Sequence, residues 1–336
     1  MTSFNALDLK AALIAGLAVC ATSAVAHTSN DSMAQAAAFF ANADLVGAPK
    51  VVDCTLSQGA QTKCLSITVK ANPQSYTPGP WCPSNIADGA EAGGIWLKNG
   101  EVHDVDGSFI KNLAELYGDA EWQLYDADTG NVRFTGTLQA CQAAARPDVD
   151  PAYQNYCVQC LPEYMPEDAT TTYVIPVEPQ AANKSQPTNF SGSGVAYNGI
   201  RLDGPAPLDA ILAAHTIAPF DDCGGHVNTH VGYHYHAVTD CLQQSPATLD
   251  PAAAKHGSQI GIAMDGFQIL PHLTVSGTEP DDLDSCNGHL SEGLDYHYHA
   301  GTAGSNAILG CLTAQAGCVL EDDTAVCDAS KRPPRP

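Results

Sequence analysis

The segment 221–237 reads Asp-Asp-Cys-Gly-Gly-His, then Val-Asn-Thr-His-Val-Gly, then Tyr-His-Tyr-His-Ala. The segment 284–300 reads Asp-Ser-Cys-Asn-Gly-His, then Leu-Ser-Glu-Gly-Leu-Asp, then Tyr-His-Tyr-His-Ala. The leading Asp, the Cys, one Gly, three His, two Tyr and the final Ala keep the same offsets, whereas the six residues before each Tyr-His-Tyr-His run differ. Because the same side chains recur at the same spacing while the residues between them differ, the two segments indicate a duplicated unit.

The alternation within each Tyr-His-Tyr-His run is typical of a β-strand. Successive side chains of a strand point to opposite faces, so His234 and His236 share one face and the tyrosines share the other. His226 lies eight residues before His234, and Gly232 permits a turn between them. A hairpin turning there would bring His226 beside the other two imidazoles.

Three imidazoles on one face of a hairpin are typical of a metal site. Three neutral histidines with an open fourth position are a common ligand set for zinc, and they also suit copper, nickel or non-haem iron. We therefore predict a transition-metal cofactor, zinc or copper first. An alternative is that the rings are buried hydrogen-bonding groups that lock a turn. The candidate metal ligands are His226, His234, His236, His289, His297 and His299. The sequence leaves open whether these residues hold one shared ion or two separate ions.

Five other histidines have no partner at a matching offset in the repeat. We expect each to be a surface or core residue and not a ligand. They are His103, His215, His230, His256 and His272.

Two pairs of side chains also recur and carry two interpretations. Asp221 and Asp284 each precede a repeated Cys by two residues, and Asn198 and Asp265 recur in an upstream turn. Either pair would orient ligand imidazoles as hydrogen-bond acceptors. The alternative is turn formation, since Asn and Asp side chains bond their own backbone, and we favour it for Asn198 and Asp265.

The repeat extends upstream of the histidines. Gly-Val-Ala-Tyr-Asn-Gly-Ile at 194–200 matches Gly-Ile-Ala-Met-Asp-Gly-Phe at 261–267, and each predicts a strand running into a hairpin turn. We therefore predict a mainly β fold, β-rich α+β, built from duplicated β units at about 190–250 and 257–312. The two halves are expected to pack with approximate two-fold symmetry.

These motifs also carry a family resemblance. The two Cys-x-Gly-His turns, both Tyr-His-Tyr-His runs and the two upstream strand-turn segments are similar to those of the YHYH domain family of secreted proteins. The resemblance spans roughly residues 93–312 and implies a domain without naming a reaction. On either side we place a β-hairpin and loop region at 27–92 and a C-terminal tail at 313–336.

Residues 1–26 have the pattern of a secretory signal. Lys10 precedes the apolar run 11–19, and Ala-Val-Ala at 24–26 is a cleavage site. A lipoprotein signal ending at Cys20 is the competing interpretation. We expect a secreted or periplasmic protein, with no transmembrane segment after signal removal.

The cysteine count fits export. Of thirteen cysteines, removal of Cys20 leaves twelve, enough for six disulfides. Spacing predicts the pairs Cys54–Cys64, Cys223–Cys241 and Cys286–Cys311. For Cys157-x-x-Cys160 we favour ordinary disulfide partners over a redox pair or a metal half-site.

Charge narrows the range of partners. The formal net charge of −23 disfavours nucleic acid and anionic membrane surfaces, which are bound through clustered Lys and Arg. Protein partners are not predicted.

The sequence does not indicate which reaction, if any, the protein catalyses. The sequence has no Gly-x-Ser-x-Gly elbow and no glycine-rich phosphate loop with Lys. A metal-dependent hydrolase or oxidoreductase using the same histidines is therefore an alternative to a metal-binding module, and catalytic residues are not assigned.

Outside the repeat, the coarse pattern predicts a hairpin over 51–69, a helix over 109–117, a hairpin over 122–134 and a polar linker over 179–189.

Overall fold

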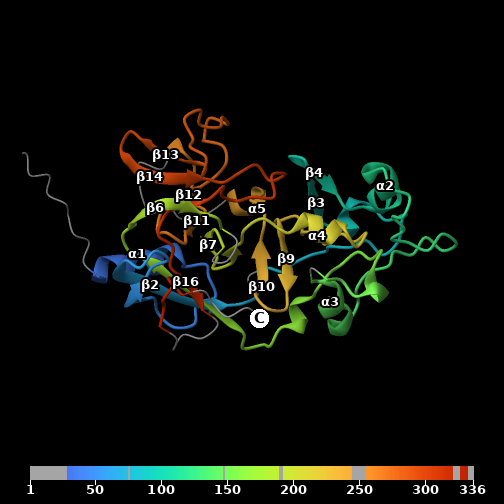
Figure 1. Cartoon of the computed structure of the whole chain (residues 1–336), viewed down its shortest axis with the longest axis horizontal. Coiled ribbons are helices and arrows are strands. Elements are labelled where there is room, and N and C mark those ends of the chain that lie inside the picture. Colours follow the sequence, from blue (N-terminus) through green and yellow to red (C-terminus); the bar gives the residue numbers. More distant parts are fainter. Residues whose placement is uncertain are drawn as a thin grey trace, which may run out of the picture.

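The computed structural model describes residues 29–74, 76–146, 148–188, 192–243, 255–320 and 326–331. The predicted signal peptide at 1–26 lies outside these residues. Strands dominate the described chain and helices are few and short, so the predicted mainly β fold is confirmed (Figure 1).

The duplicated motifs form one eight-stranded sheet with the strand order β13-β14-β12-β11-β7-β8-β10-β9. The first half contributes β7 (Gly194–Ala196), β8 (Arg201–Leu202), β9 (Gly225–Asn228) and β10 (Gly232–Tyr235). The second half contributes β11 (Gly261–Ala263), β12 (Gln268–Leu270), β13 (Gly288–Ser291) and β14 (Leu294–His299).

The sheet has an approximate two-fold axis between β7 and β11. These strands pair antiparallel with Val195 opposite Ile262, and these two residues are equivalent in the repeat. Outward from the axis the register is also the same, because β8 runs parallel to β10 as β12 runs parallel to β14. Tyr235 lies opposite Leu202, as Tyr298 lies opposite Ile269. The predicted symmetry is therefore present in the backbone hydrogen bonding.

A four-stranded sheet with the order β1-β2-β5-β16 packs against this duplicated unit. Its strands are β1 (Lys50–Thr55), β2 (Gln61–Lys70), β5 (Thr170–Pro176) and β16 (Cys318–Leu320), and α1 (Ser29–Phe39) packs beside them. The hairpin predicted over 51–69 is β1 and β2. Apolar residues of α1, β2 and β5 share one buried cluster with Tyr233, Tyr235 and Tyr298 of the eight-stranded sheet. The main core therefore lies on the tyrosine face of that sheet.

The middle of the chain contributes further short elements, and some of them surround a second buried cluster that includes Trp96, Ile110 and Leu113. These elements are η1 (Ala90–Ala92), β3 (Ile95–Lys98), β4 (Glu101–Asp104), α2 (Gly107–Tyr117), α3 (Leu138–Ala144), η2 (Pro151–Tyr153), η3 (Pro162–Tyr164), α4 (Leu208–Leu212) and α5 (Asp240–Gln243). The predicted helix is α2, which begins after the Asp106 cap and ends at Gly118, whose φ of 63° suits glycine. The hairpin predicted over 122–134 is reduced to one bridge, between Tyr125 and Val132.

One expectation for this region is wrong. Part of the predicted polar linker is the strand β6 (Ala181–Gln186), which pairs with β15 (Leu312–Ala314). Most side chains of β6 are exposed, so its sequence has no alternating apolar pattern to reveal it. Pairing with a segment more than a hundred residues away makes it a strand.

Six disulfides cross-link the described chain, including the three pairs predicted from spacing. Cys157 and Cys160 are ordinary disulfide partners, bonded to Cys82 and Cys141 respectively. The sixth bond joins Cys318 and Cys327. Such a set is typical of a protein exported to an oxidising compartment. Among the helices described, none has the length and apolar character needed to cross a bilayer.

Candidate metal centres

Two edge hairpins gather the predicted ligands. In the hairpin of β9 and β10, His226 lies directly opposite His234. In the hairpin of β13 and β14, His289 lies directly opposite His297. The turn at Gly232 has φ 79°, a conformation that glycine adopts without strain. Strand alternation then adds the third ring of each set, two residues further along.

In the first cluster (His226, His234 and His236), each ring faces the other two. The ring centroids are 4.8 to 5.0 Å apart, and one candidate ligand atom per residue lies within 4.8 Å of the others. The Phe220 ring packs against His226 and His236 from outside the cluster. This spacing suits three rings that bind one ion.

Backbone carbonyls fix the orientation of the paired rings. His234 Nδ1 lies 3.0 Å from the Gly232 oxygen, and His236 Nδ1 lies 2.7 Å from the Gly204 oxygen. Because a carbonyl only accepts, each Nδ1 donates the proton and each Nε2 keeps its lone pair. Fixing a ligand tautomer through its other nitrogen is the usual support of metal-binding histidines.

The second half repeats this arrangement. His297 Nδ1 donates to the Asp295 oxygen at 2.8 Å, and His299 Nδ1 donates to the Pro271 oxygen at 2.6 Å. These acceptors are the repeat equivalents of those in the first cluster. His289 Nδ1 lies 2.6 Å from Asp282 Oδ1, so a carboxylate orients this ring.

Burial keeps the rings in the form that binds metal. Burial lowers the pKa of His226, His234 and His236 to about 3, with further lowering by the neighbouring rings. Burial likewise lowers the pKa of His297 and His299 to about 4. The rings are therefore neutral at pH 7, and a metal ion would not compete with protons there.

The structure adds a ligand candidate that the sequence interpretation rejected. His256 joins His289, His297 and His299 in a second cluster whose candidate ligand atoms lie within 4.8 Å of one another. Its Nδ1 is 3.2 Å from His299 Nε2, and its ring centroid is 4.8 Å from that of His297. The sequence pattern sets His256 apart from the candidate ligands, but the structure places its ring among them. It was missed because it lies before β11, outside the repeated offsets.

Two nitrogen atoms of the second cluster are buried without a partner among the described residues. They are Nε2 of His289 and Nε2 of His297. A buried polar atom without a hydrogen bond costs free energy, and a bound ion is one way to satisfy it. The four rings therefore form a donor set that fits a four-coordinate ion.

The first cluster is completed differently. Asp203 Oδ2 lies 4.0 Å from His234 Nε2, and Arg201 holds Asp203 Oδ1 at 2.9 Å. The repeat equivalent of Asp203 is Leu270, so the second half has no such carboxylate. A cavity of ≈ 540 Å³ reaches His226, His234 and His236. The first cluster is therefore an open set of three imidazoles, and the second is a set of four.

The two clusters cannot share one ion. They lie on β9/β10 and β13/β14, at opposite ends of the eight-stranded order (Figure 1). From β10 to β14 there are five strand-to-strand steps, roughly 24 Å at the usual spacing. Any ions bound by the two clusters would therefore be separate, which answers the question that the sequence left open.

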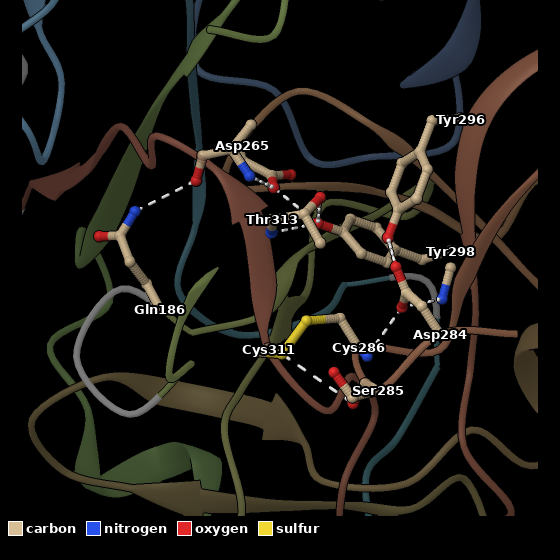
Figure 2. The surroundings of a disulfide bond; sticks show 11 residues. Gln186, Asp265, Asp284, Ser285, Cys286, Tyr296, Tyr298, Cys311 and Thr313 are labelled. Atoms are coloured by element: carbon tan, nitrogen blue, oxygen red, sulfur yellow. Dashed lines mark hydrogen bonds between the residues drawn. A yellow bond between two sulfur atoms is a disulfide. The ribbon is translucent and has the colours of Figure 1, made fainter. Parts of the chain in front are cut away.

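The repeated Asp and Asn residues support the tyrosine face and not the imidazoles. Asp284 accepts from Tyr296 OH at 2.8 Å, and Asp265 accepts from Tyr298 OH at 2.7 Å. Figure 2 shows these residues in the surroundings of the Cys286–Cys311 disulfide. Asp284 also accepts from two backbone amides of its own turn.

The first half matches this pattern. Asp221 accepts from Tyr233 OH at 2.9 and 2.8 Å, and Asn198 donates to Tyr235 OH at 3.1 Å. Turn formation is therefore the correct interpretation of these residues, with tyrosine anchoring as a second role.

Among the described residues, the remaining four histidines lie outside both clusters, as expected. His230 is exposed at the first hairpin turn. Three others lie beside carboxylates elsewhere: His103 near Glu101, His215 near Asp119 and His272 near Glu279.

Comparison with known proteins gives one result. The family model described as YHYH protein matches residues 172–282, which include the first Tyr-His-Tyr-His run. The chain therefore contains a YHYH domain, as the sequence motifs indicate. The second run lies beyond the matched residues, so its relationship to the first rests on the internal repeat. No curated protein and no solved structure matches the chain.

Proposed function

We propose that this YHYH-domain protein is an exported metal-binding protein that holds one transition-metal ion, zinc or copper, in each histidine cluster. One observation carries the proposal. Two symmetry-related hairpins hold His234, His236, His297 and His299 through Nδ1 on equivalent backbone carbonyls, which leaves Nε2 of each ring for an ion. Imidazole donors favour zinc and copper over calcium and magnesium, which prefer oxygen.

The two sites are expected to differ in role. Four protein ligands close a zinc site and make it structural, whereas three protein ligands leave a position for water or substrate. His256 gives the second cluster the closed set, and the cavity at His226 gives the first the open set. The second cluster is then a structural centre and the first an exchangeable one.

Metal stoichiometry tests the proposal. Elemental analysis of protein purified from its native compartment should give two equivalents of a transition metal. The pair His234→Ala with His236→Ala should leave one equivalent, as should the pair His297→Ala with His299→Ala. Combining all four changes should leave none.

A matched control comes from His103 and His272, whose replacement by Ala should leave two equivalents. Wild-type stoichiometry in the fourfold variant would refute the proposal. One equivalent in wild type, lost with either pair, would refute separate sites.

A metal-dependent hydrolase or oxidoreductase is a second candidate, because the first cluster opens onto a cavity. A metal position with a free face activates water or dioxygen. An activity that chelation removes, that one metal restores and that His236→Ala abolishes would support this candidate. If His297→Ala abolished the same activity and His236→Ala did not, the active site would not be at the first cluster.

A further inference from the structure

The cavity beside the first cluster has the size and make-up of a small-molecule site. Its volume of ≈ 540 Å³ falls within the range of about 300 to 1,000 Å³ that such sites occupy. Apolar side chains line most of it, including Trp81, Val149, Val158 and Ile211. Three imidazoles and Asp203 lie together at its polar end.

Several polar groups elsewhere in the lining already have partners. Arg146 forms two hydrogen bonds with Asp148, at 2.7 and 2.6 Å. Thr216 donates to the Ile211 carbonyl, and Gln159 accepts from the Cys82 amide. At the cluster, three imidazoles and Asp203 offer further polar contacts to a ligand.

Asp203 decides the chemistry of that contact. Its Oδ1 accepts from Arg201 and from the Gly204 amide, whereas its Oδ2 lies 4.0 Å from His234 Nε2. That separation exceeds a direct hydrogen bond. Arg201 offsets the charge of this carboxylate, but Oδ2 remains a hydrogen-bond acceptor beside the cluster, so it favours a ligand group that donates a proton.

We propose that the cavity binds a small neutral alcohol or phenol. Its hydroxyl would lie beside Asp203 and the three imidazoles of the first cluster, where it would donate a hydrogen bond to Asp203 and offer its oxygen lone pairs to an ion bound by the cluster. Its apolar body lies against the apolar walls. The inference rests on the proposed metal site and adds the class of ligand. The second cluster, with Leu270 at the equivalent position and His256 as a fourth ring, is not expected to bind such a ligand.

Isothermal titration of the full-length, zinc-loaded chain with benzyl alcohol tests the inference. We expect saturable binding of benzyl alcohol, and much weaker binding of benzyl methyl ether and of benzoate. Asp203→Leu, which copies the second half, should weaken benzyl alcohol binding about tenfold or more, because hydrogen bonds to charged groups are among the stronger ones. Ala210→Phe, at the cavity wall, should abolish it.

Asp209→Leu is the matched control, because Asp209 is exposed on the same helix as Ala210. It should leave benzyl alcohol binding unchanged. Zinc content, measured on every sample, separates the two proposals. Full zinc content with no binding, or with equal binding of the ether, overturns the alcohol site and leaves the metal sites intact. Absence of zinc from the first cluster overturns both. Stronger binding of benzoate than of benzyl alcohol overturns the assigned ligand class.

Discussion

The two histidine clusters share a frame and differ in how that frame is completed. Both place three rings on an edge hairpin, with equivalent carbonyls holding Nδ1 of the paired rings. A fourth ring, His256, completes the second cluster, whereas Asp203 and a cavity lie beside the first. The two copies have thus kept the groups that orient the rings, and they differ in the groups that control the access of other molecules to each cluster.

The difference follows from where each residue lies in the sheet. The shared rings lie on paired strands, where a one-residue shift would move every side chain to the opposite face. His256 lies in a segment before β11, and Asp203 follows the last residue of β8. His256 is therefore free of the strand register, whereas Asp203 continues the ladder through its amide, which donates to the Tyr235 carbonyl, so that only its side chain differs from that of Leu270. The fourth position is therefore where the two halves diverge.

The largest expected effect is loss of stability in acid by the metal-free protein. The unfolded chain protonates its histidines near pH 6.5, whereas the folded first cluster stays neutral down to about pH 3. Between these values the unfolded state binds more protons, so stability falls as pH falls, by roughly 1.4 kcal/mol per pH unit for each histidine. Chemical unfolding between pH 7 and pH 5, with chelator present and disulfides intact, measures this slope.

Replacing both His234 and His236 by Gln should make this slope shallower. Asp221 and Asp265, whose pKa values burial raises, contribute to both proteins, so the difference isolates the imidazoles. His230→Gln is the exposed control and should keep the wild-type slope. Identical slopes in all three proteins would show that the cluster rings are already protonated in the fold.

The next effect separates the clusters by metal affinity. His256→Ala should weaken metal binding at the second cluster by more than about 100-fold, because changes that only touch outer partners of a ligand already cost 10- to 100-fold. The first cluster should be unaffected. Competition with a chromophoric chelator resolves the two affinities. The same loss at both clusters, or at neither, would refute His256 as a ligand of the second site.

The smallest effect compares the tyrosine anchors on the opposite face. Tyr233 is buried and donates to both oxygens of buried Asp221, so Tyr233→Phe should cost about 1–3 kcal/mol of unfolding free energy. Tyr296 donates to Asp284, which is exposed, so water can replace the lost hydroxyl as a donor. Tyr296→Phe should therefore lower the unfolding free energy by less than about 1 kcal/mol. Denaturant unfolding of both variants provides the comparison. A larger cost at Tyr296 would reverse the assigned order.

The sequence predicts much of both histidine hairpins, because the patterns that specify them span only a few residues. Alternation within Tyr-His-Tyr-His and the turn at Gly232 predict that His226 lies opposite the pair, and the structure places it opposite His234. Equal offsets in the second copy extend this to His289. Short cysteine spacings identify three of the six disulfides for the same reason.

The remainder depends on contacts between distant segments. His256 reaches its cluster from a loop that lies 33 to 43 residues (289 − 256 and 299 − 256) before the other rings. The strand β6 exists because β15 pairs with it, and its polar residues carry no pattern. The cavity combines side chains from 81 to 236. Local spacing contains no signal for any of these.

The pairing of β7 with β11 has a consequence for how such a sheet is assembled. Val195 and Ile262 are repeat equivalents that face each other across an antiparallel register, so the contact is self-complementary. A half cut from the chain would expose this strand as an open edge, and two identical halves would close it as an isologous homodimer. Covalent fusion makes that association intramolecular and independent of protein concentration. It also frees each half to change its own residues, which a homodimer of identical subunits cannot do.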